Sequence, residues 1–304
     1  MNPAINAIIP LLILISLGFL SRRFGILKAG DERVLSAYVY YFALPSLFLV
    51  AISEVKFTEE TMLFILSGVL PIIILVGLYA TIYAIFGIKR ETFFLLSLST
   101  IFGSLAFFGI PFIIFALPES ETMASLQAAM VSIVAVSMSI TLLEIYSTNE
   151  NLARGFSRVA KKLSKNPLII SILIGLFFSF SGIKIPSLIL SPLHMLGRST
   201  SVVAIFMLGV FLYGRKYGNI KLAFALSMLR IFLLPFITFL LATLLRLPKN
   251  ETMIAVLMNA MPMAISMIVL SHRYKFYEDV IASIIMISSL AAIAYLNIWF
   301  FVLS

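Results

Sequence analysis

Residues 100–111 read TIFGSLAFFGIP, and residues 258–266 read MNAMPMAIS. Both stretches lie inside long apolar runs, and each contains a proline. Proline has no N–H to donate, and its ring collides with the carbonyl four residues back, so each apolar helix is predicted to be interrupted there. Unwound backbone at membrane depth is tolerated only where it faces protein or a water-filled cavity. The two stretches therefore predict a pair of broken helices whose breaks face the protein interior.

The composition of the whole chain supports a membrane location. Hydrophobic residues make up 62% of the sequence and charged residues 12%, and the mean hydropathy is +1.12. A soluble domain is about 45–50% apolar and about 25% charged. The formal charge of +9 comes from short clusters between apolar runs, which indicates membrane orientation rather than nucleic-acid binding. Because the chain has no cysteine, it can form neither a disulfide nor a cysteine-based metal site.

Apolar runs long enough to cross the membrane recur along the chain. A spanning helix needs about 20 mostly apolar residues, and helices are the structure expected for such runs. The first run has no basic region ahead of it and is expected to be a retained span rather than a signal peptide. The sequence predicts ten spans, approximately Ile5–Leu20, Val34–Ile52, Thr61–Phe86, Phe93–Leu117, Met123–Ile145, Pro167–Ser181, Ser199–Tyr213, Leu222–Leu245, Thr252–Leu270 and Val280–Phe301.

Basic residues alternate between the two sides that these spans define. Loops after odd-numbered spans hold sixteen Lys and Arg residues, and loops after even-numbered spans hold five. Since short cytoplasmic loops are enriched in Lys and Arg, this asymmetry supports ten spans with both termini outside. We therefore expect a multi-pass protein of the cell (plasma) membrane.

The basic stretch in the middle divides the chain into two halves of five spans. The first half is residues 1–146, the cytoplasmic linker is residues 147–166, and the second half is residues 167–304. An odd number of spans in each half makes an internal repeat inverted, which is common in secondary transporters. The two proline-containing stretches fall in the fourth span of each half. Interrupted segments at matching positions are a sequence indication of a transporter's substrate site.

Short motifs in order along the chain resemble those of the auxin efflux carrier family. The resemblance covers nearly the whole chain and includes prokaryotic members. Its architecture is related to that of inverted-repeat carriers similar to bile acid/sodium symporters. The matching residues are Leu17-Gly18, Arg22-Arg23-Phe24-Gly25-Ile26-Leu27, Leu35-Ser36, Ala43-Leu44-Pro45-Ser46-Leu47, Phe108-Gly109-Ile110-Pro111, Asn166-Pro167, Met261-Pro262-Met263-Ala264 and Tyr274.

The resemblance implies a fold and a function. It implies crossing, broken fourth and ninth helices, a scaffold of spans 1, 2, 6 and 7, and a mobile unit of spans 3–5 and 8–10 that moves as an elevator. Prokaryotic members are described as malate or malonate permeases, and plant members export auxin. Many members carry Asn at the positions that Ser104 and Ser266 occupy here. A serine hydroxyl still donates and accepts hydrogen bonds.

The candidate substrate site lies at the two breaks. The amide end of a half-helix carries positive partial charge, so it suits a carboxylate. No Asp or Glu lies deep inside a predicted span, which favours movement of an anion over a proton relay. The candidate substrate-binding residues at the breaks are Ser104, Gly109, Ile110, Pro111, Asn259, Pro262 and Ser266.

Arg230 is the only basic residue well inside a predicted span. A charge inside the membrane suggests function, so Arg230 joins the candidate substrate-binding residues. Two structural interpretations compete with that role. Its long side chain could reach the cytoplasmic surface, since it lies about nine residues, or roughly 13 Å, past the basic loop. It could also form an ion pair with Glu144.

These features favour a secondary carrier for a small organic anion, either a dicarboxylate such as malate or malonate or an auxin-like weak acid. No catalytic residues, metal or cofactor are expected, because the sequence has no G-x-S-x-G, H-E-x-x-H or phosphate-loop motif. The alternative is a receptor or sensor that keeps the carrier fold without transport, and a channel is a further one. The expected partners are the anion, the lipid bilayer and a second copy of the chain in a homodimer, with no nucleic acid.

Overall fold

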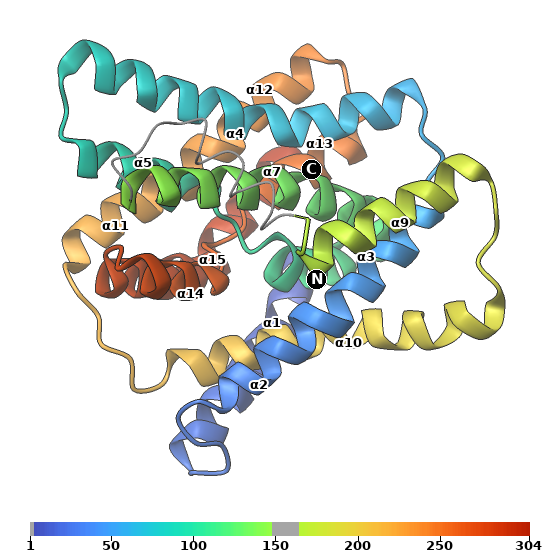
Figure 1. Ribbon diagram of the computed structural model, residues 1–304, viewed down its shortest axis with the longest axis horizontal. Helices are drawn as coiled ribbons and strands as arrows, with labels where there is room; N and C mark the ends of the chain where they lie inside the picture. Colours follow the sequence, from blue (N-terminus) through green and yellow to red (C-terminus); the bar gives the residue numbers. More distant parts are fainter. Residues whose placement is uncertain (1–2, 148–163) are drawn as a thin grey trace. The chain divides into compact units, whose positions relative to one another are not determined.

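The computed structural model describes residues 3–147 and 164–304 (Figure 1). Most of the predicted linker, residues 147–166, lies outside these ranges. Backbone contacts divide the chain into two compact units. Unit one comprises Met1–Met62, Ala106–Ala129 and Ser164–Arg215, and unit two comprises Leu63–Leu105, Met130–Leu163 and Lys216–Ser304. Each unit draws segments from both halves of the sequence.

Unit one is built around four long helical stretches. Its second stretch is continuous but has a π-helical turn in its middle, and α9 packs beside the end of that stretch (Figure 1). The helices that lie wholly in unit one are α1 (Pro3–Arg23), α2 (Asp31–Tyr38), η1 (Val39–Ala43), α3 (Leu44–Ser53), α6 (Ile110–Ala116), η3 (Pro118–Ser120), α9 (Pro167–Ser181) and α10 (Ser187–Leu212).

Unit two contains the first half of span four and all of span nine. Three elements, α4, η2 and α7, have residues in both units. The helices in or entering unit two are α4 (Glu59–Phe86), α5 (Arg90–Ile101), η2 (Leu105–Gly109), α7 (Glu121–Ser147), α11 (Ile220–Met228), η4 (Leu229–Leu233), α12 (Leu234–Leu244), α13 (Lys249–Asn259), α14 (Ser266–Tyr274) and α15 (Glu278–Leu303).

Every predicted span overlaps a helix, so the all-helical class is confirmed for the described residues. Five of their helical stretches are long and apolar enough to cross a membrane, or six when the bent α15 is included. The segments Leu105–Ala116 and Pro167–Ser181 are shorter apolar helices. The arrangement of ten spans in two inverted repeats, and the side on which the termini lie, stay predictions.

The seventh span begins earlier than predicted. The sequence pattern indicated Ser199–Tyr213, whereas α10 starts at Ser187 and includes Pro192. His194 and Arg198 lower the hydropathy of the first half of this helix, so a count of apolar residues did not include that half in the span. Pro192 is the sixth residue of α10, so it removes one backbone hydrogen bond near the helix start without ending the helix.

Two glycines let α1 and α10 pack closely. A Cβ added at Gly18 would overlap the carbonyl oxygen of Phe206, and a Cβ added at Gly209 would overlap the carbonyl oxygen of Ile15. The two helices therefore approach backbone to backbone inside unit one. Small residues at such contacts are typical of membrane helices, because association there depends on close van der Waals packing.

Three π-helical turns share one cause. The segments η1, η2 and η4 each have five residues, and each is followed directly by an α-helix whose second residue is proline: Pro45, Pro111 and Pro235. A π turn is wider than an α turn, so it gives the proline ring room beside the carbonyl four residues back. Each of these helices therefore continues through its proline. Such π segments occur frequently at functional sites.

Candidate functional site at the paired helix breaks

The span-four helix is interrupted within the predicted stretch of residues 100–111, but before Pro111 rather than at it. Helix α5 ends at Ile101, and the unwound residues Phe102–Ser104 separate it from η2. Pro111 is instead the second residue of α6, and the π segment η2 directly before it gives the proline ring room, so the helix continues through it. The expectation that Pro111 itself breaks the helix was wrong. Gly109, Ile110 and Pro111 form a continuous helical junction and are all buried.

The span-nine helix is interrupted where the sequence predicted. Helix α13 ends at Asn259 and α14 begins at Ser266, so Pro262 lies within the unwound segment. Pro262 and the residues on either side of it are buried. Both broken spans therefore present unwound backbone inside the protein rather than to lipid, as backbone chemistry in a membrane requires.

The two breaks pair with each other in unit two. Gly103 and Met263 form an antiparallel bridge. The amide of Ser104 donates to the carbonyl of Pro262 at 2.8 Å, and the amide of Ala264 donates to the carbonyl of Phe102 at 3.0 Å. The pairing supplies hydrogen-bond partners for backbone groups that the helices no longer satisfy. The amide of Met263 completes the arrangement by donating to the Ser288 hydroxyl of α15 at 3.1 Å.

Arg230 lies at this pairing, with only 1% of its surface exposed. Its Nε donates to the carbonyl of Met261 at 2.9 Å, and its Nη1 donates to the carbonyl of Thr100. One carbonyl belongs to the break in span nine and the other to the last turn of α5. A Cβ at Gly103 would overlap Nη2 of Arg230, so only glycine leaves room for the guanidinium group.

The surroundings of Arg230 support neither of its two structural interpretations, which were extension to the cytoplasmic surface and an ion pair with Glu144. The side chain is buried among backbone carbonyls, so it does not extend to the cytoplasmic surface. Within the described residues its hydrogen bonds go to Thr100 and Met261, while Glu144 accepts a hydrogen bond from the Tyr274 hydroxyl at 2.5 Å. The carbonyl ends of α5 and α13 carry negative partial charge, which stabilises a buried cation.

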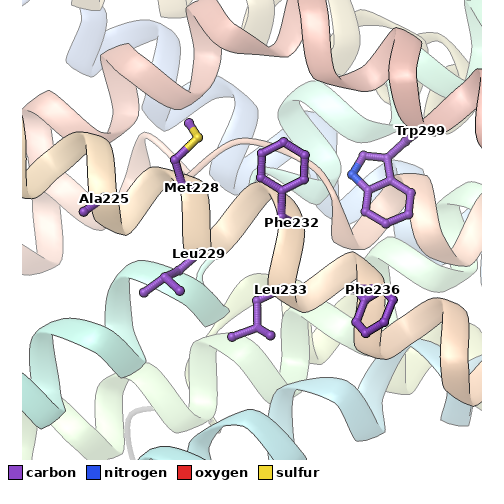
Figure 2. A pocket seen from close by; sticks show the side chains of 7 residues that line it. All are labelled: Ala225, Met228, Leu229, Phe232, Leu233, Phe236 and Trp299. Atoms are coloured by element: carbon purple, nitrogen blue, oxygen red, sulfur yellow. The ribbon is translucent and has the colours of Figure 1, made fainter.

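The π segment that carries Arg230 is fixed by Trp299. Proline at position 235 cannot donate to the carbonyl of Ile231, and the indole Nε1 of Trp299 donates to that carbonyl instead, at 2.9 Å. Figure 2 shows Trp299 beside Phe236 at the edge of a groove of about 460 Å³. The groove is lined by apolar side chains of α11, η4 and α12, which suits contact with lipid.

The other candidate residues differ in their surroundings. Ser104 is 6% exposed and lies in the pairing itself. Ser266 is half-buried and is the first residue of α14. Asn259 is 1% exposed, and its amide nitrogen donates to the carbonyl of Gly68 at 3.1 Å and to the Thr238 hydroxyl at 2.9 Å. Asn259 therefore ties α13 to α4 and α12.

The structure adds Gly103, Thr100 and Met261 to the residues chosen from the sequence. Gly103 lies within the quoted motif, but its need for a missing side chain becomes apparent only beside Arg230. Thr100 and Met261 take part through their backbone carbonyls, which leave no trace in the sequence. The described residues contain no group of three or more His, Asp or Glu side chains placed to hold a metal ion.

The apolar helices with paired, unwound breaks define an α-helical membrane protein of the transporter class. Comparison with known families makes this assignment specific. The chain belongs to the Membrane transport protein family, whose model matches residues 3–300, and this confirms the resemblance to auxin efflux carriers.

Two similar proteins match over almost their full lengths. The uncharacterized transporter MJ1031 of Methanocaldococcus jannaschii is 26% identical over 311 residues, covering 98% of each chain. The uncharacterized transporter YfdV of Escherichia coli strain K12 is 22% identical over 312 residues, covering 98% of this chain and 97% of the relative. Both are named as transporters, which are generally not enzymes.

Proposed function

We propose that this membrane transport protein is a secondary carrier for a small organic anion, either a dicarboxylate such as malate or malonate or an auxin-like weak acid. The observation that carries the proposal is the buried Arg230 at the paired breaks. A guanidinium group has five N–H donors, and its bonds to the two carbonyls use two of them. The other donors suit a carboxylate, which guanidinium groups bind in a planar, two-point geometry.

The two serines that replace asparagine in this family's pattern support a polar anion site. Ser104 lies in the pairing, and Ser266 starts α14, where the free amides of the first helical turn carry positive partial charge. A carboxylate near these groups would gain hydrogen bonds and electrostatic stabilisation. Ser266 is only half-buried, so a solute could contact its hydroxyl. The amide nitrogen of the buried Asn259 already donates to Gly68 and Thr238, so Asn259 suits a solute contact less well.

The proposed mechanism is an elevator movement. Unit two contains both paired breaks, Arg230 and most of spans 3, 8, 9 and 10. Unit one contains spans 1, 2, 6 and 7, together with the second half of span four and the start of span five (Ala106–Ala129). Apart from spans four and five, which are divided between the units, this division resembles the mobile and scaffold units that the family resemblance implies. In the mechanism we propose, unit two carries the bound anion and unit one stays fixed in the membrane.

A transport assay in liposomes tests the function. Charge movement on a solid-supported membrane would be recorded after rapid addition of malate, malonate, indole-3-acetate or a neutral sugar. We expect a saturable response to at least one carboxylate, no response to the sugar, and loss of the response in Arg230→Gln. The matched control is Lys221→Gln, which removes an exposed positive charge at the start of α11, nine residues before Arg230.

Radiolabelled uptake would detect movement that carries no net charge. Tryptophan emission provides a separate measure of binding, because Trp299 is the only tryptophan and contacts the segment that carries Arg230. Saturable emission changes with malate or malonate, without uptake, would favour the sensor alternative. Neither binding nor uptake of any carboxylate by folded protein would contradict the proposal.

A further inference from the structure

The carbonyls at the paired breaks form an environment that attracts a cation. Thr100 lies one residue before the end of α5, and Met261 lies two residues past the end of α13. The carbonyl end of a helix carries negative partial charge, and carbonyls near it lack partners from their own helix. In carriers with broken helices, such unwound carbonyls and helix ends coordinate the sodium ion or proton that drives transport.

In this protein a side chain occupies that environment. The guanidinium group of Arg230 donates to the carbonyls of both broken spans. Gly103 leaves the space for it, and Trp299 fixes the π segment from which it projects. Arginine stays protonated in proteins, so the positive charge is permanent. The site is therefore specifically built for this side chain, with contributions from spans 4, 8, 9 and 10.

We propose that Arg230 is a tethered cation that takes the place of a free coupling cation, so that transport is independent of sodium. The transport part of this inference rests on the proposed function, whereas the structural part does not. Arg230 would neutralise the carbonyl ends of α5 and α13 throughout the transport cycle. A carrier with a free ion in this position needs to bind that ion in every cycle, and this one would not.

The first test compares sodium with an inert cation. Carboxylate uptake by the wild-type protein should be the same within about twofold when sodium is replaced by choline on both sides of the membrane. Arg230→Ala should be at least about tenfold slower in choline, because the carbonyls lose their cation. Sodium or ethylguanidinium should restore part of its uptake, since either cation could enter the vacated space.

The second test needs no transported substrate. The melting temperature of purified Arg230→Ala in detergent and choline should fall by about 10 °C. Millimolar ethylguanidinium or sodium should raise it again, whereas the neutral analogue N-ethylurea should not. Lys221→Ala is the matched control, because it removes an exposed positive charge, and its melting temperature should not respond to these additives.

The outcomes separate this inference from the proposed function. Sodium-dependent uptake by the wild-type protein would overturn the tethered-cation inference. A folded Arg230→Ala whose melting temperature is the same with every additive would also overturn that inference. Absence of any carboxylate transport would contradict the proposed function, while stabilisation of Arg230→Ala by small cations would still support the tethered cation.

A variant that keeps the charge covers the case in which Arg230→Ala does not fold. Folded Arg230→Ala that can be purified only in the presence of ethylguanidinium would support the proposal. If no folded Arg230→Ala can be purified in any salt, uptake by Arg230→Lys tests the proposal instead, because lysine keeps a positive charge on a side chain of similar length. Uptake by Arg230→Lys that is independent of sodium supports the inference, and uptake that requires sodium overturns it.

Discussion

The indole N–H of Trp299 donates to the backbone carbonyl of Ile231 across 2.9 Å. This bond joins α15 to η4 at the carbonyl that Pro235 leaves without an α-helical partner. Because Arg230 precedes Ile231 directly, the bond also holds the backbone from which the buried guanidinium projects. The orientation of Arg230 therefore depends on a residue 69 positions later in the sequence.

Replacing Trp299 with Phe should destabilise the protein. The phenyl ring fills part of the space but donates no hydrogen bond, and an unpaired buried carbonyl costs about 1–3 kcal/mol. We expect the melting temperature to fall by about 5 °C, measured by circular dichroism at 222 nm in detergent. Phe301→Leu, at a side chain that is 76% exposed, is the control. Equal melting temperatures for wild-type protein and Trp299→Phe would show that the bond contributes nothing.

The contact between Gly103 and Arg230 predicts strong coupling in a double-mutant cycle. Gly103→Ala alone should destabilise the protein by about 1–3 kcal/mol, because its Cβ would overlap Nη2 of Arg230. In an Arg230→Ala background the same change should be nearly neutral, since the space is then empty. Denaturant or thermal unfolding of the four proteins measures the coupling.

A second glycine tests whether that effect is specific to the site. Gly77 lies in α4, and a Cβ added there has open space around it. Gly77→Ala should leave stability unchanged or increase it slightly, because alanine favours helix formation. Equal effects of Gly103→Ala in the wild-type and Arg230→Ala backgrounds would argue against the contact.

An engineered disulfide within unit one should leave transport intact. A Cβ placed at Gly197 would lie 3.4 Å from the Cβ of Leu47, which is close to the separation in natural disulfides of about 3.5–4.5 Å. It would also lie 3.1 Å from the Cα of Leu47, so the backbones of α3 and α10 have to separate slightly to accept the bond. The chain has no native cysteine, so Leu47→Cys with Gly197→Cys forms a single defined pair. In the elevator mechanism we propose, this bond links two parts of the fixed unit.

Uptake before and after oxidation checks this prediction. The reduced double variant is the reference, and each single cysteine variant shows the effect of the oxidant alone. We expect oxidised and reduced protein to transport at the same rate within about twofold. Loss of uptake that dithiothreitol reverses would indicate that spans 2 and 7 move relative to each other, contrary to an elevator.

Ser266 and Asn259 should respond differently to substitution. Ser266 is half-buried at the start of α14, so Ser266→Ala should raise the apparent KM for a carboxylate by about tenfold, the effect of losing one hydrogen bond to a charged group, at nearly unchanged melting temperature. Asn259→Ala should instead lower the melting temperature, because it removes the bonds to Gly68 and Thr238. Thermal unfolding and concentration-dependent uptake of both variants separate the two roles. The same response from both variants would contradict this division.

Hydropathy and proline position predicted the helices and the break in span nine, because both depend on local sequence. The sequence placed the span-four interruption within residues 100–111 but not at Phe102–Ser104, since Pro111 lies inside the helical stretch that begins at Leu105 and Gly103 matters only beside Arg230. The π segments have the same apolar composition as the α-helices around them. Arg230 stood out as an intramembrane charge, but its carbonyl partners come from residues 31 and 130 positions away in sequence.

The permanent charge on Arg230 also has an electrical consequence. It belongs to unit two, so the elevator movement we propose would carry it through part of the transmembrane field. One elementary charge moved across the full field changes the free energy by about 2.3 kcal/mol per 100 mV. A bound monoanion cancels that charge, so the loaded step would be insensitive to voltage and the return of the empty carrier would be sensitive to it. The membrane potential would then set the rate of the cycle through its empty half.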